Sequence, residues 1–411
     1  MSAGAALPPS WSRARVGSVG TVVTGSTPST GDRSNYGHEF LFVSPGDLGR
    51  TKYVTASGKM LSARGFSRSR RVPAGSTLFV CIGSTIGKVG LAGRALATNQ
   101  QINAVVPAGQ VDPEFLYYAV SALSPLVRER AGEQAVPLVN KTEFAAFEIA
   151  LPSLPEQRLI AESLSDVDAL MSVIERMLAK KQAIKLGMTQ HLLTNSTRPA
   201  GRTDPQADVR LGEISASITK GATPTTYGFA WESSGIPFLR SECVSERGLD
   251  MRQSMFISPA AHHALRRSRI ADGDILMTIT GYVGRVVRLV NTGEANINQH
   301  IARVRIKDGR FDPGYVYHYL SQHAMREYYE SIVTGQAYPQ ISLAQVRNTG
   351  VPALPHDEQR AIAAALDDAD GELTVLRRRL TKAQQVKQGM MRQLLTGRTR
   401  LPAQENAVTA V

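Results

Sequence analysis

The chain has few cysteines, the residues that crosslink a fold covalently, and it has no long apolar runs. Its 411 residues include only two cysteines, Cys81 and Cys243, which excludes a disulfide framework and a cysteine-based zinc cluster. No run of 18 apolar residues occurs, and the first residues lack the apolar core of a secretion signal. We therefore expect a protein of a reducing, cytoplasmic compartment that does not span a membrane.

Signatures of catalysis are also missing. GSTIGKVG (83–90) has three residues between its glycines and a valine after the lysine, whereas a phosphate loop needs four residues and a Ser/Thr. The neighbours His262 and His263 lack metal-ligand spacing. We find no glycine-rich cofactor fingerprint, no nucleophile elbow and no Asn/Asp-Pro-Pro-aromatic tetrad of amino-methylating enzymes. We therefore expect no catalytic residues, no metal site and no cofactor in this chain.

What the chain has in excess is positive charge. Lysine and arginine number 47 against 35 acidic residues, which gives a net charge of +12. This excess favours a polyanionic partner, although many basic proteins bind no nucleic acid. With 42% hydrophobic residues the chain is globular, and its length allows two domains with their own cores.

A segment in the middle of the chain is repeated near its end. LPSLPEQRLIA (151–161) returns as VPALPHDEQRAIA (351–363), and the LLT at 192–194 returns at 394–396. The segments before these copies repeat more weakly, with GSTP (25–28) returning as GATP (221–224), GSTLFVCIGSTIGKV (75–89) as GDILMTITGYVGRV (273–286), and Asn99-Gln100 as Asn298-Gln299. The chain therefore consists of two similar halves, each a diverged head followed by one long helix.

The repeat predicts the domain organisation. In the first head, 75–93 predicts strand, turn and strand, and 112–130 predicts one helix capped by Asp112. The expected parts are a flexible leader (1–10), a first head (11–152), a central helix (153–195), a linker (196–208), a second head (209–352), a C-terminal helix (353–397) and a flexible tail (398–411).

Both helices carry an apolar heptad pattern. The seam of the first is Leu164, Val167, Met171, Ile174, Leu178, Lys181, Lys185, Met188 and Leu192; the seam of the second is Leu366, Ala369, Leu373, Leu376, Leu380, Ala383, Lys387, Met390 and Leu394. A heptad in both copies favours mutual pairing over packing of each stripe on its own head. The acidic residues that flank the seam are expected to form a solvated face or a subunit contact; they are Asp166, Asp168, Asp368 and Asp370.

The three seam lysines predict the direction of pairing. A parallel pair would set Lys185 against Lys387, whereas an antiparallel pair lets each lysine lay its stem on an apolar partner and lift its ammonium group to water. The predicted fold class is therefore α+β: two similar mixed α/β domains joined by two long helices in an antiparallel coiled coil of roughly 50–55 Å. The internal repeat is then related by an approximate two-fold axis.

Two similar basic heads on a rigid spacer fit a protein that contacts two separated segments of one duplex. Because the heads differ, we expect two unlike half-sites. Base readout needs amide and guanidinium groups on loops, although each such residue could instead be an ordinary hydrated side chain. The candidates are Lys88, Asn99, Gln100, Gln101, Gln134, Asn140 and Lys141 in the first head, and Arg240, Ser241, Thr280, Tyr282, Arg285, Gln299, His300, Gln336, Tyr338 and Gln340 in the second. The arginine pairs 70–71 and 266–267 are expected to contact phosphates.

The order of these motifs, present twice, resembles the specificity subunit of type I restriction–modification systems. The resemblance covers nearly the whole chain and rests on the head openings, the GDIL…TGYVG segment (273–284), the Asn-Gln pairs and the helix copies. The first head departs from it where GSTL replaces GDIL and where VSPGD (43–47) matches FLRSE (238–242) weakly.

The resemblance implies a non-catalytic subunit with two target-recognition domains that bind a split asymmetric duplex site. It also implies two docked adenine-N6 methyltransferase subunits, which use S-adenosylmethionine, and restriction–translocase subunits, which use ATP and Mg²⁺. The helices would then serve as spacer and docking surface. Two alternatives are a fused methylase or nuclease, against which the missing catalytic signatures count, and a protein-only coiled-coil scaffold, which the net charge disfavours.

Overall fold

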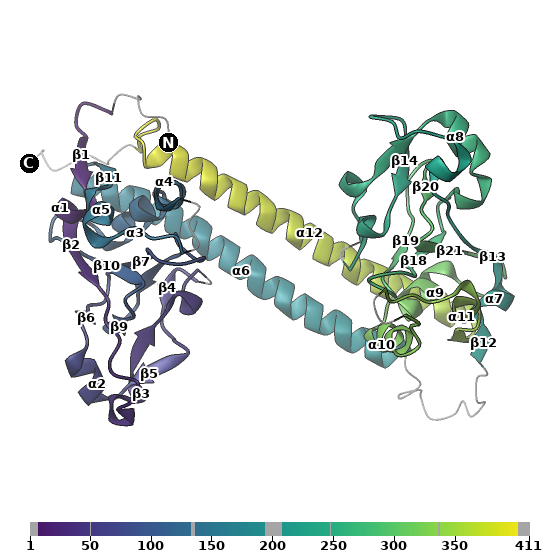
Figure 1. Cartoon of the computed structure of the whole chain (residues 1–411), viewed down its shortest axis with the longest axis horizontal. Coiled ribbons are helices and arrows are strands. Elements are labelled where there is room, and N and C mark those ends of the chain that lie inside the picture. The colour runs from purple at the N-terminus through teal and green to yellow at the C-terminus, as the bar shows by residue number, and fades with distance from the viewer. Residues whose placement is uncertain are drawn as a thin grey trace, which may run out of the picture. The chain divides into compact units, whose positions relative to one another are not determined.

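The computed structural model describes residues 7–49, 51–132, 136–193, 208–246, 248–335 and 338–401. The chain divides into two compact units: unit 1 comprises Met1–Arg176 and Arg378–Val411, and unit 2 comprises Met177–Arg377. Each unit therefore contains one head and parts of both long helices, α6 (Leu154–Leu193) and α12 (His356–Leu394) (Figure 1).

The head of unit 1 is built on two mixed sheets. One has the strand order β2 (Gly20–Thr24), β10 (Ile102–Pro107), β7 (Thr77–Val80), β8 (Val89–Ala92) and β4 (Tyr53–Val54). The other has the order β5 (Lys59–Leu61), β3 (Tyr36–Val43), β9 (Leu96–Thr98) and β6 (Arg71–Val72), and a separate pair joins β1 (Ser12–Arg15) to β11 (Glu148–Leu151). Only β4–β8 and β3–β9 are parallel, and the strand-turn-strand prediction for 75–93 is confirmed.

Short helices cover these sheets: α1 (Val16–Val19), α2 (Ala63–Arg68), α3 (Pro113–Ser121), α4 (Ser124–Ala131) and α5 (Lys141–Ala146). The prediction of one helix over 112–130 was wrong, because the helix is interrupted between α3 and α4. Pro125 lies in the first turn of the second helix. The predicted cap is confirmed: the Asp112 carboxylate accepts hydrogen bonds from the backbone nitrogens of Glu114 and Phe115.

The head of unit 2 repeats this plan. One sheet has the strand order β13 (Ser215–Lys220), β21 (Ile301–Ile306), β18 (Ile275–Thr278) and β19 (Val286–Arg288). A second sheet has the order β17 (Met255–Ile257), β14 (Ile236–Leu239) and β20 (Asn296–Ile297). Two-stranded pairs are β12 (Asp208–Arg210) with β22 (Gly350–Pro352), and β15 (Val244–Ser245) with β16 (Gly248–Leu249). The helices are α7 (Leu211–Ile214), α8 (Pro259–Ala264), α9 (Pro313–Leu320), α10 (His323–Ser331) and α11 (Leu343–Arg347).

Each head packs its core on the first turns of the helix that follows it. Leu164 of α6 is fully buried in unit 1 with Phe115 of α3, and Leu366 of α12 is fully buried in unit 2 with Tyr315 of α9. The far end of the other helix joins the same core, through Leu394 in unit 1. Apolar burial thus fixes the head on both helices within each unit.

The two helices run antiparallel within each unit, as the sequence predicts. In unit 1, Lys387 late in α12 pairs with Asp168 early in α6 at 2.6 Å. In unit 2, Lys185 late in α6 pairs with Asp370 in α12 at 2.5 Å. Every predicted seam residue is buried or half-buried. The predicted fold class, two mixed α/β heads and two long antiparallel helices, is confirmed.

The environment of the seam charges differs from the prediction. The ammonium groups of the seam lysines do not simply reach water, because Lys387 and Lys185 form ion pairs with the flanking Asp168 and Asp370. The third seam lysine, Lys181, pairs with Glu372 of the opposite helix at 2.6 Å. These two aspartates therefore belong to the helix contact. A half-buried lysine between apolar neighbours is better compensated by a carboxylate than by partial hydration. Asp166 and Asp368 are exposed, as expected of a solvated face.

The boundary residues of unit 1 were expected to be flexible, and here too the structure differs. Leu7 and Leu401 pack on the core of unit 1. The buried Glu156 carboxylate accepts a hydrogen bond from the Trp11 indole at 3.0 Å and pairs with Arg400 at 2.9 Å. Residues 7–10 and 398–401 are therefore part of the unit. The other residues of the predicted leader and tail, and most of the predicted linker, lie outside the described residues.

No helix in the described part of the chain is long and apolar enough to cross a membrane.

The seam ion pair of unit 2 predicts the result of a charge swap. Lys185→Asp and Asp370→Lys should each cost about 1–2 kcal/mol of unfolding free energy, because each places like charges together in a half-buried contact. The double variant should recover most of this loss, as measured by urea unfolding in a double-mutant cycle. Lys180→Asp, an exposed site on the same helix, is the control and should stay within about 0.5 kcal/mol. Additive losses in the cycle would contradict the pairing.

The buried Glu156 predicts a dependence on Arg400. Arg400→Ala should lower the free energy of unfolding, because it leaves the buried Glu156 carboxylate without its cation. Adding Glu156→Gln should restore part of the stability, since the neutral amide can still accept from Trp11. Arg398→Ala, an exposed neighbour, is the matched control in thermal and urea unfolding. An Arg400 variant as stable as the control would show that the contact contributes nothing.

The buried His318 of unit 2 predicts acid sensitivity. Burial lowers the pKa of His318 below its ordinary value of 6.5, although the neighbouring Asp367 opposes this effect. The unfolded chain then binds the proton more readily, so this contribution is complete above pH 6.5 and is lost as the pH falls below it. The slope should be at most about 1.4 kcal/mol per pH unit for one proton. His318→Gln should abolish this part of the pH dependence in unfolding measured from pH 7 to 5, and an unchanged slope would refute the assignment.

Candidate nucleic-acid interface

The duplicated Asn-Gln pairs build the same turn in both units. Residues 99–101 connect β9 to β10, and residues 298–300 connect β20 to β21. The Asn99 side chain accepts from the backbone nitrogen of Gln101 at 3.2 Å, and Asn298 accepts from that of His300 at 3.1 Å. Both asparagines therefore shape an Asx turn.

The duplicated Gly-x-Thr-Pro motifs contact these turns. Gly25 and Gly221 follow β2 and β13, and a Cβ at either glycine would overlap a backbone carbonyl of the opposite turn. The hydroxyl of Thr27 donates to the side-chain oxygen of Gln100 at 2.6 Å, and Thr223 donates to Gln299 at 2.8 Å. Two motifs far apart in the sequence thus form one local structure, present once in each unit.

Unit 2 has a recess of about 760 Å³ beside this structure. It is bounded by the turns at residues 240–245, 280–285 and 298–300. Eight of the candidates predicted in the second head line it: Arg240, Ser241, Thr280, Tyr282, Arg285, Gln299, His300 and Tyr338. Gln336, like Gln134 of the first head, lies outside the described residues. The structure therefore gathers the predicted base-reading groups of the second head at one site.

The recess combines cationic and aromatic groups. The Arg285 guanidinium lies over the Tyr282 ring at 4.1 Å, and Tyr282 is 73% exposed. Arg240 donates to the Gln253 carbonyl at 3.3 Å, while its Nε is buried without a hydrogen-bond partner in the described part of the chain. Guanidinium groups contact base edges, and exposed aromatic rings stack on bases.

Sequence reasoning missed several lining residues. Glu242 and Asp250 add carboxylates, and Trp231 and Phe238 add aromatic rings. A carboxylate can accept from a cytosine amino group, although Asp250 already accepts from Arg252 at 2.8 Å. The sequence search sought donors and so passed over these acids. Thr223 was recognised as part of a repeated motif, but its hydrogen bond to Gln299 gave no signal in the sequence.

The candidates of unit 1 also come together at two neighbouring turns. Asn99 donates to the Gln101 side-chain oxygen at 2.9 Å, and Gln101 donates to the Ile82 carbonyl at 3.5 Å. The stem of Lys88, in the same turn as Ile82, lies against Gly49. Four predicted residues of the first head, Lys88, Asn99, Gln100 and Gln101, therefore lie on adjacent turns.

The structure corrects the alignment of the two heads by one residue. Asn99 donates through its backbone to the Val43 carbonyl, and Asn298 donates to the Leu239 carbonyl. Val43 therefore corresponds to Leu239, and the next residue, Ser44, corresponds to Arg240. In the same register, Gly46 corresponds to Glu242. The charged pair of unit 2 thus has an uncharged counterpart in unit 1.

Two other groups of candidates lie elsewhere in their heads. Asn140 caps α5 by accepting from the Glu143 nitrogen at 2.9 Å, which accounts for its position, and Lys141 is exposed on the first turn. The arginines at 70, 71, 266 and 267 are all exposed. Contact of these residues with DNA stays a prediction. Gln340 accepts and donates backbone bonds to Thr334, beside the recess-lining Tyr338.

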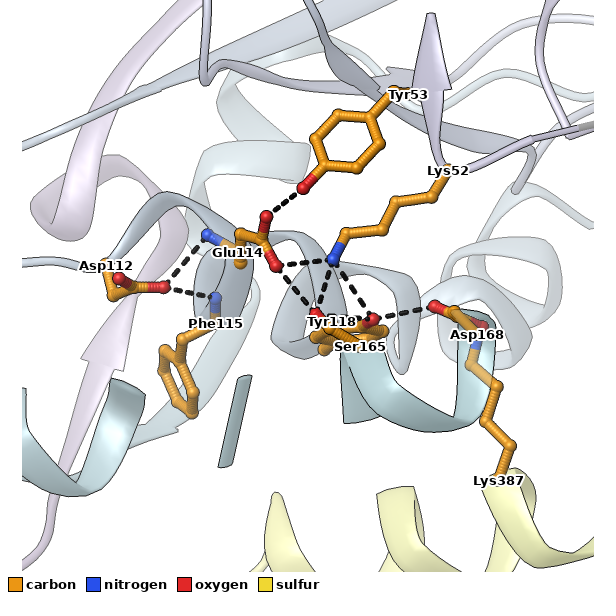
Figure 2. A network of polar contacts seen from close by, with 9 residues as sticks. All are labelled: Lys52, Tyr53, Asp112, Glu114, Phe115, Tyr118, Ser165, Asp168 and Lys387. Carbon is orange, nitrogen blue, oxygen red and sulfur yellow. Dashed lines mark hydrogen bonds and ion pairs between the residues drawn. The ribbon is translucent and has the colours of Figure 1, made fainter. Parts of the chain in front are cut away.

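A polar network fixes the first head on the helices (Figure 2). The Lys52 ammonium group, in a side chain 9% exposed, donates to Glu114 at 2.5 Å and to Ser165 of α6 at 2.7 Å. Tyr118 of α3 donates to Asp168 at 2.6 Å, and Asp168 pairs with Lys387. The network thus connects the head to both helices.

The network also holds a carboxylate ionised. Burial alone would raise the pKa of Glu114, but hydrogen bonds from Lys52, Tyr53 and Ser165 hold it below its ordinary value. Burial and the Glu114 carboxylate raise the pKa of Tyr53 to about 12. These groups are matched donors and acceptors, so they position the head and do not form a reactive site.

Unit 2 makes the equivalent attachment with other residues. Asp367 of α12 accepts from Arg288 at 2.7 Å and lies 2.8 Å from His318 of α9. The glutamines of the two Glu-Gln-Arg motifs are used alike: Gln157 accepts from the Asp112 nitrogen and Gln359 from the Asp312 nitrogen, each at 2.9 Å. This motif therefore joins the start of each long helix to its head.

Within the ranges that the structure describes, no group of three or more His, Cys, Asp or Glu side chains is placed to hold a metal ion.

Comparison with known proteins agrees with this architecture. The type I restriction modification DNA specificity domain matches residues 8–186 and again residues 205–385. The chain is 26% identical over 71% of its length to the putative MjaX specificity subunit of Methanocaldococcus jannaschii, covering 69% of that protein. It is 24% identical over 77% of its length to the MjaVIII specificity subunit of the same organism, covering 76% of that protein.

Two solved structures are similar in fold. One is the S subunit of a type I restriction–modification system from M. genitalium, with a TM-score of 0.62 at 14% identity over 96% of this chain and 98% of that chain. The other comes from a study of complex assembly and conformational transition in the type I R-M system, with a TM-score of 0.55 at 21% identity over 96% of this chain and 100% of that chain. Because both domain matches together span most of the sequence, the chain belongs to the family of type I restriction–modification specificity subunits and carries two of its DNA specificity domains.

Proposed function

We propose that the two heads of this specificity subunit bind the two parts of one split, asymmetric duplex site. The observation that carries the proposal is the recess of unit 2, where eight residues predicted to read bases line one cavity of about 760 Å³. The net charge of +12 supports a polyanionic ligand. The unlike residues at corresponding positions, Ser44 and Arg240, support two unlike half-sites.

We further propose that this chain is non-catalytic and that partner subunits supply the chemistry. Two adenine-N6 methyltransferase subunits would use S-adenosylmethionine, and restriction–translocase subunits would use ATP and Mg²⁺. The protein would work in the cytoplasm, where its DNA substrate lies. Family membership and the lack of catalytic motifs in the sequence support this division of labour.

The long helices are the proposed docking surface for these subunits. Both carry apolar side chains that are between 42% and 54% exposed: Leu170, Val173, Met177, Ile184 and Leu186 on α6, and Val375 and Val386 on α12. Apolar residues that stay exposed beside a satisfied seam are typical of a surface that another protein covers. A protein-only scaffold would use the same surface, but it would not need the recess.

The proposal predicts the loss of one methylation motif. Sequencing of N6-methyladenine across the genome, with and without this gene, should reveal one bipartite motif that disappears with the gene. Purified complex should also lose duplex affinity linearly on a log–log plot against salt concentration. Salt-independent binding, or no binding with the methyltransferase present, would favour the scaffold.

Arg240→Ala should relax the motif in one half only. Loss of a guanidinium contact to a base edge costs about 1–3 kcal/mol of discrimination at one position. Arg266→Ala, which removes an exposed arginine expected at a phosphate, is the control and should weaken binding without changing the motif. An unchanged motif in the Arg240 variant would remove this residue from base reading.

A further inference from the structure

The turns beside the recess of unit 2 and the corresponding turns of unit 1 differ at the positions of Arg240 and Glu242 but share one hydrogen-bonded pair. Ser44 and Gly46 in unit 1 stand where Arg240 and Glu242 stand in unit 2, yet Thr27–Gln100 and Thr223–Gln299 form the same contact. If the heads read unlike half-sites, as proposed above, residues that choose the bases must differ. A pair common to both heads is therefore suited to a contact that every sequence offers.

The shared pair leaves a defined chemical group for a ligand. In both units the threonine hydroxyl donates to the glutamine side-chain oxygen, at 2.6 Å in unit 1 and 2.8 Å in unit 2. The amide nitrogen, with two protons, is then the group left to face outward. Gln100 is exposed, and the Gln299 nitrogen uses one proton at most on the His300 ring nitrogen, 3.0 Å away. Each pair thus presents an N–H donor.

The position of this donor is fixed by the backbone. Gly25 and Gly221 press against the turns that carry the glutamines, so closely that neither site has room for a Cβ. The side chains of Asn99 and Asn298 accept hydrogen bonds from backbone nitrogens of the same turns and so also hold them in place. A donor on such a frame can define the register of a head on its ligand.

In both units an exposed arginine lies near the end of the strand that leads into the Gly-x-Thr-Pro motif, which is β2 in unit 1 and β13 in unit 2. The backbone nitrogen of Arg70 donates to Ser26, inside the first Gly-x-Thr-Pro motif, at 3.1 Å. In unit 2 the carbonyl of Arg267 accepts from Thr219, near the end of β13, at 3.2 Å. The Arg70 guanidinium donates to the Thr24 carbonyl at the end of β2, at 2.9 Å, and so keeps positive charge close to the first motif. A neutral N–H donor in a region of positive charge suits a phosphate contact, because phosphate oxygens only accept hydrogen bonds.

We propose that Gln100 and Gln299, each oriented by its threonine, donate the same hydrogen bond to a backbone phosphate of the DNA half-site that its head binds. These two contacts set the register of each head whatever the sequence, and the unshared side chains read the bases. The inference rests on the proposed function and changes the role of two predicted base readers, because it assigns Gln100 and Gln299 to positioning and leaves base reading to the unshared side chains.

Gln299→Glu tests the donor directly, because it keeps the oxygen that accepts from Thr223 and replaces the N–H donor with an anionic oxygen. With the methyltransferase complex assembled on the full chain, affinity should fall roughly tenfold to a hundredfold for a labelled duplex carrying the motif. Affinity for a scrambled duplex should fall by a similar factor, and the methylated motif should stay unchanged. Gln100→Glu should behave alike, whereas Gln110→Glu, an exposed site with the same charge change, should alter affinity less than about twofold.

Neutral methylphosphonate linkages placed one at a time in the duplex identify the phosphate. The wild-type complex should lose affinity at each linkage that the head of unit 2 contacts, and Gln299→Ala should become insensitive to one of these linkages while remaining folded. A change of motif in the Gln299 variants would make this residue a base reader and overturn the inference, as would an unchanged affinity. Failure of the wild-type complex to prefer its motif would instead refute the proposed function.

Discussion

The ion pair between a seam lysine and an aspartate of the opposite helix is the interaction on which the arrangement of each unit depends. It occurs as Asp168–Lys387 in unit 1 and as Lys185–Asp370 in unit 2, and the repeat offset of 202 converts one pair into the other. An in-register parallel pair would instead align the two lysines. Half-buried ion pairs contribute modestly to stability, so their main effect is on direction and register.

The antiparallel direction brings the end of each helix to the head that precedes the other helix. Leu394 then reaches the core of unit 1, where Leu164 already lies. Each head is therefore held by both helices. Apolar burial and a few charged contacts fix the position of the head, and with it the position of the turns that carry the candidate residues. These turns are similar in the two units, whereas corresponding positions beside them differ, as Ser44 and Arg240 do.

Much of this fold could be predicted from the sequence, because periodicity determines which helix residues meet. The seam from Leu164 to Leu192 follows from the heptad alone. The aspartate partners could not be found this way, since Asp168 flanks the seam and its distance to Lys387 depends on the rotation of both helices. The break before α4 was missed because an apolar pattern continues through it, and a proline in the first turn of a helix is compatible with either interpretation.

The candidate site was predicted in part. Turn residues such as Gln299 and Arg285 were identified because amides and guanidinium groups on loops are recognisable in a sequence. Trp231 was missed because only the folded chain brings it beside those turns, whereas Glu242 was missed because the search sought donor groups. The equivalence of Ser44 and Arg240 likewise required strand pairing, since the sequences around them have diverged beyond reliable alignment.

The two heads are attached to their helices by different residues. This difference determines which portion of the chain can be exchanged between subunits of different specificity. Ser165 and Asp367 occupy equivalent helix positions, but Ser165 donates to Glu114 whereas Asp367 accepts from Arg288. A first head joined to the second helix at the end of its last strand would set Glu114 against the carboxylate of Asp367. An exchange that keeps these contacts must therefore transfer the head together with the opening turns of its helix.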